Sequence, residues 1–325
     1  MAYLVKSSWK SFGVPELPNN DSNAGSKIGF GEFTENRKQG ARQIAPSVYC
    51  LYRVSVLTNT LVGSILIDED NDARGVRLAD GREIYSNEVI ISAGAYRTPQ
   101  LLMLSGLGPK EVLDKHGIEV KVDIPGVGQN LNDHIMLHLN WKLKALSVRN
   151  LYWGDVLGSS NPIFAEPRFA TGTPSSYVAY TKMPPSDLEA AIAKDEGKVD
   201  SDHYLLKREW AVMENIVMYV ATPPVRTDGR HISTVQMALK PTSRGTVTIA
   251  SNDPADDPVI DPNYFATEVD KSVWRHSLRN IESFMTRDAF LGPEIDCETP
   301  PPGFEPLTEE ASDEYLDSRV KAHGV

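Results

Sequence analysis

The sequence predicts a mixed fold, α/β plus α+β, with a parallel-sheet strand in one part and a mostly antiparallel sheet in the other. The first indication is a short apolar run, Val89–Ile91, followed by a glycine turn and a helix-forming segment. The second is a series of strand-like runs between residues 176 and 250, with few helices between them. A chain of 325 residues, 41% of them hydrophobic, can form one large domain or two ordinary ones.

The N-terminal third predicts a loop-rich segment followed by short strands. Residues 1–45 are rich in glycine and charge, which favours loops with one short helix near the start. The β-rich runs VSVLTN (54–59) and LVGSILID (61–68) then predict strands. The dipeptide Asp80-Gly81 lies between two further short strands and predicts a tight hairpin.

A strand, a helix and a stop follow one another between residues 88 and 123. We expect Val89–Ile91 to be a strand that is buried on both faces. Thr98 can cap the next helix, Pro99 suits its first turn, and Gly106 suits the left-handed position after its end. A second short helix over 109–116 and a strand over 118–123 complete this region.

The C-terminal half predicts strands at 176–181 and 215–221, with a helix near 186–196 between them. The runs VQMALKP and GTVTIAS flank Thr242-Ser243-Arg244 and predict a hairpin. A long amphipathic helix and a last short helix over 311–321 follow. The apolar residues of the long helix share one face: Val273, Trp274, Leu278, Ile281, Phe284 and Met285.

Composition excludes several classes of protein. The net charge of −11 argues against a nucleic-acid partner, because phosphate backbones are bound by clustered Lys and Arg. No apolar run reaches the length of about 20 residues that a membrane-spanning helix needs, and the start does not resemble a signal peptide. Cys50 and Cys297 predict two buried free thiols rather than a disulfide, and with them a cytoplasmic location.

Several motifs are incomplete and predict turns rather than sites. Three glycine pairs, beginning at Gly29, Gly106 and Gly126, lack the third glycine of G-x-G-x-x-G. The stretch from Asp68 to Gly75 lacks the glycine and the final glutamate of a calcium loop. No H-E-x-x-H or G-x-S-x-G motif is present, so neither a metal site nor a catalytic residue is predicted.

A set of ordered blocks resembles the glucose–methanol–choline (GMC) family of flavin oxidoreductases. The closest match to the family's second signature runs through Gly94-Ala95, Thr98–Leu102 and Leu104–Pro109. Supporting blocks lie on both sides and in family order: Val56–Val62, Glu88–Gly94, Pro125–Leu131, Asp133-His134, Ser243–Val247 and Asp261–Tyr264.

The resemblance implies FAD as cofactor and oxidation of a small-molecule alcohol by hydride transfer. It places the adenosine half of FAD beside Val62 and the segment Ser92, Ala93 and Gly94, with the helix from Thr98 packed beneath the cofactor. Strand alternation then suggests the residues that line a substrate pocket: Tyr177, Tyr180 and Met218.

The resemblance also implies a domain plan. Residues 1–45 form a lid segment associated with the substrate region, and 46–138 form a partial FAD-binding (Rossmann-like) domain. Residues 139–310 form a substrate-binding domain around an antiparallel sheet. Residues 311–325 form a helix that leads back towards the FAD domain.

Two blocks that the family pattern leads one to expect are missing from this sequence. These are the N-terminal strand–G-x-G-x-x-G–helix unit, which holds the FAD pyrophosphate, and the H-P-x-G-T-like block with the catalytic histidine. His323 precedes that block by spacing, so we do not give it the catalytic role. We therefore expect an impaired, truncated enzyme whose exposed sheet surface favours self-association.

Two alternatives remain. In the first, the chain is a cofactor-free descendant, such as an isomerase, cyclase, lyase or binding protein, that uses the substrate-domain pocket. In the second, another chain complements this one and supplies the two missing blocks.

Overall fold

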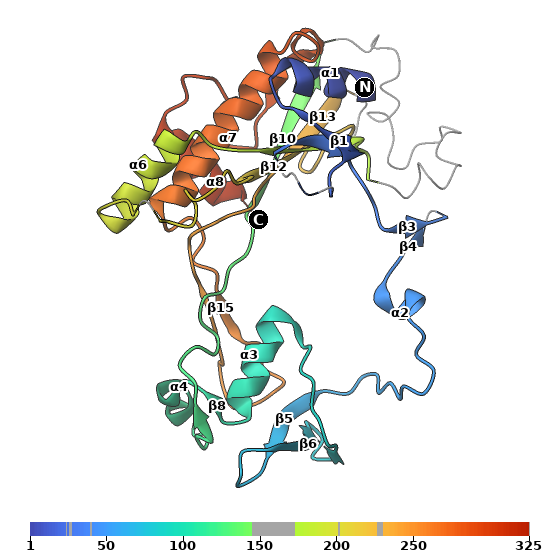
Figure 1. Cartoon of the computed structure of the whole chain (residues 1–325), viewed down its shortest axis with the longest axis vertical. Helices are drawn as coiled ribbons and strands as arrows, with labels where there is room; N and C mark the ends of the chain where they lie inside the picture. The colour runs from blue at the N-terminus through green and yellow to red at the C-terminus, as the bar shows by residue number, and fades with distance from the viewer. Residues whose placement is uncertain are drawn as a thin grey trace. The chain divides into compact units, whose positions relative to one another are not determined.

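The computed structural model describes residues 1–23, 25, 28–39, 41–144, 173–200, 202–225 and 230–324. The chain divides into two compact units, shown in Figure 1. The first unit comprises Met1–Cys50, His134–Thr242 and Phe265–Val325, and the second comprises Leu51–Asp133 and Ser243–Tyr264. The four-part domain plan expected from the sequence stays a prediction.

The first unit is built on a seven-stranded mixed sheet with the order β1-β2-β11-β12-β13-β10-β16. Only β1 and β2 pair in parallel; every other neighbouring pair in this sheet is antiparallel. The strand bounds are Glu16–Asp21 (β1), Gly29–Glu32 (β2), Tyr177–Thr181 (β11), Met213–Met218 (β12), His231–Ala238 (β13), Met136–Leu143 (β10) and Ile295–Thr299 (β16). A separate two-stranded ribbon pairs β3 (Arg37–Lys38) with β4 (Ala41–Arg42).

One face of this sheet forms the main core with the long helix α7 (Glu268–Arg287). Leu139 and Trp141 of β10 and Val217 of β12 are buried together with the whole predicted apolar face of that helix, which confirms the prediction. Trp274 of α7 is 1% exposed. The described residues of the unit also form the helices α1 (Ala2–Ser11), α2 (Ala45–Val48), α6 (Pro185–Glu196) and α8 (Asp313–His323) and the 3₁₀ turn η2 (Gly292–Glu294).

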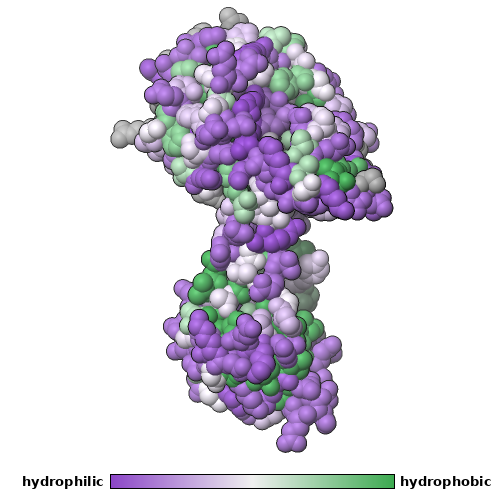
Figure 2. Space-filling view, turned by 90° about the vertical axis from the view of Figure 1, so that its left-hand side faces the viewer, coloured by the Kyte–Doolittle hydropathy of each residue, from purple (hydrophilic) through white to green (hydrophobic). Residues whose placement is uncertain are grey.

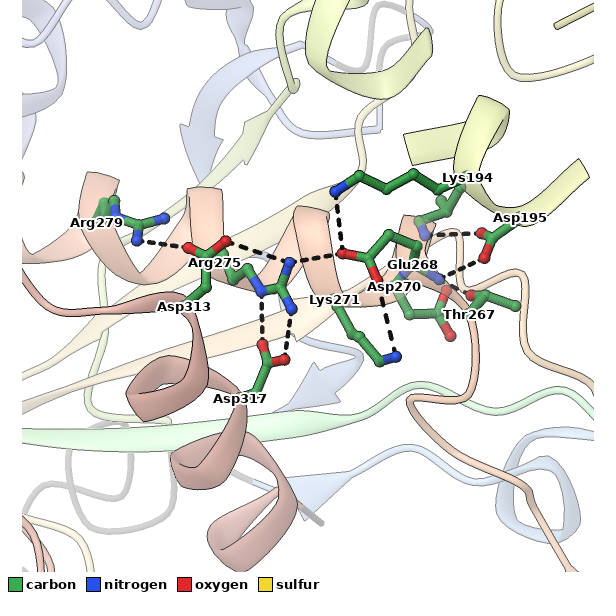
Figure 3. A network of polar contacts seen from close by, with 11 residues as sticks. Lys194, Asp195, Thr267, Glu268, Asp270, Lys271, Arg275, Arg279, Asp313 and Asp317 are labelled. Atoms are coloured by element: carbon green, nitrogen blue, oxygen red, sulfur yellow. Dashed lines mark hydrogen bonds and ion pairs between the residues drawn. The ribbon is translucent and has the colours of Figure 1, made fainter. Parts of the chain in front are cut away.

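A network of polar contacts joins α6, α7 and α8 (Figure 3). Asp195 of α6 accepts hydrogen bonds from the backbone N–H groups of Glu268 and Val269, at 2.7 and 2.9 Å, and so caps the N-terminus of α7. Arg275 of α7 makes two parallel bonds to Asp317 of α8, at 2.7 and 2.5 Å, and a third to Glu268 at 2.7 Å. This fork fixes α8 along α7.

The second unit contains a three-stranded meander, two helices and two short two-stranded pairings. The hairpin between β6 and β7 turns at Asp80-Gly81, as predicted, and Gly81 has a φ of +87°. The helix α3 ends at Leu104, and Gly106 lies in the left-handed region that the sequence predicts. The bounds are Val62–Ile67 (β5), Ala73–Leu78 (β6), Glu83–Tyr85 (β7), Gly94–Leu104 (α3), Leu107–Gly108 (β8), Lys110–Lys115 (α4), Val122–Asp123 (β9), Thr246–Thr248 (β14) and Val259–Asp261 (β15).

The helix α3 begins at Gly94, four residues before the predicted capping residue Thr98. Gly94 has a φ of +81°, and Ala93 takes the N-cap position without a side-chain hydrogen bond. Pro99 therefore lies inside the helix, which gives up the one hydrogen bond that a proline cannot donate.

Two predicted strands are not strands in the structure. The runs 54–59 and 89–91 have no strand assignment, and Val56 and Ile90 are 61% and 80% exposed. A strand needs a neighbour for its N–H and C=O groups, and the part of the chain that the structure describes pairs none with these runs. Their sequences are β-prone, but propensity alone does not make a strand.

The predicted hairpin across Thr242-Ser243-Arg244 is also wrong. The strand β13 ends in the sheet of the first unit, whereas β14 pairs with β15 in the second. Asp270 accepts a 2.7 Å hydrogen bond from the backbone N–H of Thr242, which holds the chain on the first unit at this point.

The cysteines confirm one expectation and contradict another. Cys50 and Cys297 form no disulfide with each other, as expected, but both are exposed rather than buried. Cys297 lies on β16, opposite the half-exposed Lys142 of β10, on the side of the strand that faces away from the core.

Candidate functional site

A cavity of about 500 Å³ in the second unit brings together three of the residues that the resemblance assigns to the cofactor. Val62 lies at the start of β5, and Ser92 and Ala93 form the entry to α3. The volume lies within the range usual for small-molecule sites. Most of the remaining wall is apolar: Leu61, Val76, Val89, Ile90, Ile91, Leu101, Leu104 and Pro254. We call this cavity the β5–α3 cavity.

Two polar residues of the β5–α3 cavity were missed by the sequence reasoning. Arg97 donates to Gln100 Oε1 at 2.8 Å, to the carbonyl of Asp256 at 3.0 Å and to Asp257 Oδ1 at 2.5 Å. Gln100, which is 4% exposed, donates to the same Asp256 carbonyl at 2.8 Å. The aspartate-rich loop that follows β14 therefore holds the polar side chains of α3 in place.

The aspartates of that loop also cap their own backbone, as the sequence predicts. Asp253 accepts from the N–H of Ala255 at 2.9 Å, and Asp261 accepts from the N–H of Asn263 at 2.9 Å. The contacts of this loop with Arg97 and Gln100 could not be predicted from the sequence, because they join residues about 160 positions apart.

Gly94 and Thr98 line a second hollow of about 380 Å³ on the same unit. Its opposite wall comes from the turn at residues 127–129 and from Val247. An added Cβ on Gly94 would meet no atom within 4 Å, so this glycine borders open space. The predicted cofactor residues thus divide between two hollows that the segment 92–98 connects.

The residues present fit an adenosine-like group in this region. The β5–α3 cavity has an apolar wall suited to a planar ring, and Gly94 leaves room where a side chain would fill the space. The N-terminus of α3, an 11-residue helix, opens at the same place without a side-chain cap. Its backbone N–H groups suit an anionic group such as phosphate.

The predicted substrate residues are on two different faces of the seven-stranded sheet. Tyr180 and Met218 pack with Val178, Ile216 and Val235 on the face away from α7, which we call the open face. Tyr177 lies three residues before Tyr180, so its ring points to the core side, where it meets Phe30 edge-on at 6.0 Å.

A carboxylate that the sequence reasoning missed accompanies Tyr180 on the open face. Glu214 of β12 is the register partner of Tyr180 and accepts a hydrogen bond from its hydroxyl. Burial and the nearby Glu214 carboxylate raise the pKa of Tyr180 to about 12. Burial also raises the pKa of Glu214, and the Tyr180 hydrogen bond partly offsets this effect.

Other candidate chemistry is absent from the described residues. They hold no group of three or more His, Cys, Asp or Glu side chains arranged to bind a metal ion. Asp68 instead accepts from the backbone N–H groups of Asp70 and Asp72, which makes the calcium-like stretch a turn. None of the described helices is both long and apolar enough to cross a membrane. His323 ends α8, and no catalytic residue is assigned.

The fold is shared with solved structures of flavin-dependent enzymes. A formate oxidase from Aspergillus oryzae superposes with a TM-score of 0.81 at 24% identity, over 99% of this chain and 58% of the oxidase chain. An FAD-dependent oxidoreductase from Chaetomium thermophilum superposes with a TM-score of 0.77 at 23% identity, over 99% and 60% of the two chains. Identities this low show the fold alone.

Sequence comparison identifies the family. Two family models, both described as GMC oxidoreductase, match residues 4–136 and 241–325. They cover more than half of the chain between them, and the chain belongs to the GMC oxidoreductase family.

Individual relatives span more than one named activity. The GMC-type oxidoreductase acuG of Aspergillus aculeatus is 40% identical over 318 residues, which are 94% of this chain and 58% of the relative. The versicolorin B synthase of Aspergillus parasiticus is 35% identical over 254 residues, which are 74% of this chain and 38% of the relative. The chain therefore spans about half the length of the curated relatives it matches.

Proposed function

We propose that this chain forms part of a flavin oxidoreductase that oxidises the CH–OH group of a small-molecule alcohol. The observation that carries the proposal is that Val62, Ser92 and Ala93 line one cavity, next to the open space at Gly94. Family membership supports the cofactor and the reaction class. When bound, FAD supplies the acceptor for the hydride that leaves the alcohol carbon.

The residues of this chain contribute binding surfaces to that reaction. Val62, Ser92, Ala93 and Gly94 border the adenosine half of FAD, and the helix from Thr98 packs beneath the cofactor. Tyr180, Met218 and Glu214 on the open face contact the substrate, with the tyrosine–glutamate pair as its polar contact. Tyr177 supports this face from the core side.

We infer the kind of partner and the location of the protein from its net charge, its cysteines and its surface. The net charge of −11 supports a small-molecule partner rather than nucleic acid. The absence of a disulfide between the two cysteines supports a cytoplasmic location. Apolar side chains gather on the surface of the body that carries α3 and β5 (green in Figure 2). Val56, Leu57 and Ile90 of the second unit are among its exposed apolar residues. This surface supports self-association or pairing with a complementing chain.

This chain on its own should bind FAD weakly and turn over negligibly. The sequence contains no G-x-G-x-x-G cradle, and none of the described residues is placed as the proton acceptor. We expect a purified sample that has been mixed with FAD and desalted to show little flavin absorbance between 300 and 550 nm. Adding benzyl alcohol should not bleach what remains. Stoichiometric flavin that the alcohol bleaches would contradict this expectation and would show the oxidation directly.

A second candidate is a cofactor-free reaction on the open face, and the relatives named as synthases favour it. In that case the tyrosine–glutamate pair would act on the substrate without a flavin. A cooperatively melting protein that shows no saturable FAD binding at any concentration would support this alternative over the oxidoreductase.

A further inference from the structure

A cavity of about 230 Å³ lies in the first unit, between the segment 205–212 and the residues around the start of α6. Its lining residues are separate from those that the proposed function assigns to cofactor and substrate. Six of them are apolar: Met183, Pro185, Leu188, Leu205, Leu206 and Val212. The remaining four are Lys182, Arg208, Glu209 and Trp210. We call this hollow the Trp210 cavity.

The apolar wall of the Trp210 cavity reaches the main core of the unit. Met183, Leu188, Leu205 and Val212 are each 6% exposed or less and belong to the cluster that packs against α7. The hydrocarbon part of a ligand would lose contact with water against this wall. The volume is below the range usual for drug-sized ligands, which limits that part to a short chain.

The residues around Trp210 are held in place by hydrogen bonds. Trp210 Nε1 donates to the carbonyl of Tyr204 at 2.9 Å, and the backbone N–H of Val212 donates to the carbonyl of Thr181 at 2.9 Å. The wall is therefore formed before a ligand arrives, which lowers the entropic cost of binding.

Two cations lie against the Trp210 ring. The guanidinium carbon of Arg208 is 3.8 Å from the ring centroid, and Lys240 Nζ is 4.5 Å from it. Neither cation has a hydrogen bond or an ion pair with another residue in the part of the chain that the structure describes. Their charges are not neutralised there, although the chain as a whole has a net charge of −11.

A ligand with a negative charge fits these cations. Lys182 is already paired with Glu209, so Arg208 and Lys240 supply the positive charge that is left over. They would repel a cationic ligand and would give a neutral ligand no ionic attraction. The guanidinium also offers the planar pair of N–H donors that a carboxylate accepts.

We propose that the Trp210 cavity binds a short apolar carboxylate. The hydrocarbon part lies against the apolar wall, and the carboxylate pairs with Arg208 and Lys240. All of these residues lie in the first unit, and none is assigned to the flavin or the alcohol. The test needs neither of them, so its failure would leave the proposed oxidoreductase function untouched.

The test compares three probes of the same chain length and different charge: hexanoate, hexanamide and hexylammonium. Each is titrated into the ¹⁵N-labelled full chain at pH 7.5, with the indole N–H signals of its five tryptophans observed by NMR. Trp210→Phe identifies the signal of Trp210.

We expect hexanoate to shift the Trp210 signal in a saturable way. Its affinity should be about threefold to tenfold higher than that of hexanamide, and hexylammonium should bind more weakly than either. Hexanamide or hexylammonium binding as tightly as hexanoate, or no saturable shift with hexanoate, would overturn the proposal.

Variants then locate the carboxylate. Arg208→Met and Lys240→Met keep an unbranched side chain and remove the charge, so each should weaken hexanoate binding about twofold to fivefold and leave hexanamide binding unchanged. Lys198→Met, at an exposed position of the same unit outside the cavity, is the matched control and should change neither. Hexanoate affinity that is unchanged in both cavity variants, or equally lowered in the control, would contradict the assignment. The comparison of the three probes on the unaltered chain decides the question even if one variant does not fold.

Discussion

Replacing Arg319 with Met should lower the free energy of unfolding by about 3–5 kcal/mol, the largest effect of any single charge removal that we expect. Arg319 and Glu298 have side chains that are each 1% exposed, and they form two parallel hydrogen bonds. Without the guanidinium, the Glu298 carboxylate stays buried without a counter-charge. Urea unfolding followed by far-UV circular dichroism measures the difference.

Two controls separate this effect from the loss of any arginine. Arg287 pairs with Glu309, but its side chain is 48% exposed, so Arg287→Met should lower the free energy of unfolding far less than Arg319→Met. The double variant Arg319→Met with Glu298→Leu removes both charges and should recover much of the lost stability. A loss below about 1 kcal/mol in Arg319→Met alone would mean that the pair is not buried as described.

Replacing Trp274 with Ala should also cost about 3–5 kcal/mol, because it opens a large cavity in the main core. Trp274 is 1% exposed on α7 and lies in the cluster that joins this helix to the seven-stranded sheet. The same urea measurement applies. Phe290→Ala removes an aromatic ring that is 38% exposed, and we expect it to cost less than about 1 kcal/mol. Equal losses in the two variants would contradict the core assignment.

Features that depend on neighbouring residues could be predicted from the sequence. The apolar face of α7 follows from helical spacing, and all six of its predicted residues are buried. The hairpin at Asp80-Gly81 and the helix stop at Gly106 follow from local backbone chemistry, and the structure has both. In each case the sequence contains every residue that the interaction needs within a few positions.

Features that depend on distant partners could not be predicted in this way. The β-prone runs at 54–59 and 89–91 lack a paired neighbour among the described residues, and a strand cannot form alone. The hairpin predicted at Thr242–Arg244 is wrong: Asp270, which is 28 residues away, holds Thr242 on the first unit, whereas β14 lies in the second. The spacing of residues along the sequence shows neither the missing strand neighbour nor the hydrogen bond between Asp270 and Thr242.

The candidate site shows the same division. The cavity groups Val62, Ser92 and Ala93, which only the family resemblance had connected. Arg97 and Gln100 went unnoticed because their partners lie in the loop after β14. The pairing of Tyr180 with Glu214 depends on the register of β11 against β12, across 34 residues. The roles of these residues towards cofactor and substrate stay predictions.

The central claim is that the segment from Ser92 to Gly94 borders the adenosine half of FAD. A titration of the full chain with FAD, followed by flavin fluorescence, tests it through two matched glycine variants. Gly94 and Gly81 have φ values of +81° and +87°, and an added Cβ would meet no atom within 4 Å at either position. Ala should therefore strain the backbone about equally at both positions.

We expect the unaltered chain and Gly81→Ala to show the same weak, saturable FAD binding. Gly94→Ala should weaken that binding at least about tenfold, because its Cβ would occupy space that the ligand fills. Equal FAD affinity in the two variants, or no saturable binding by the unaltered chain, would contradict the placement of the cofactor.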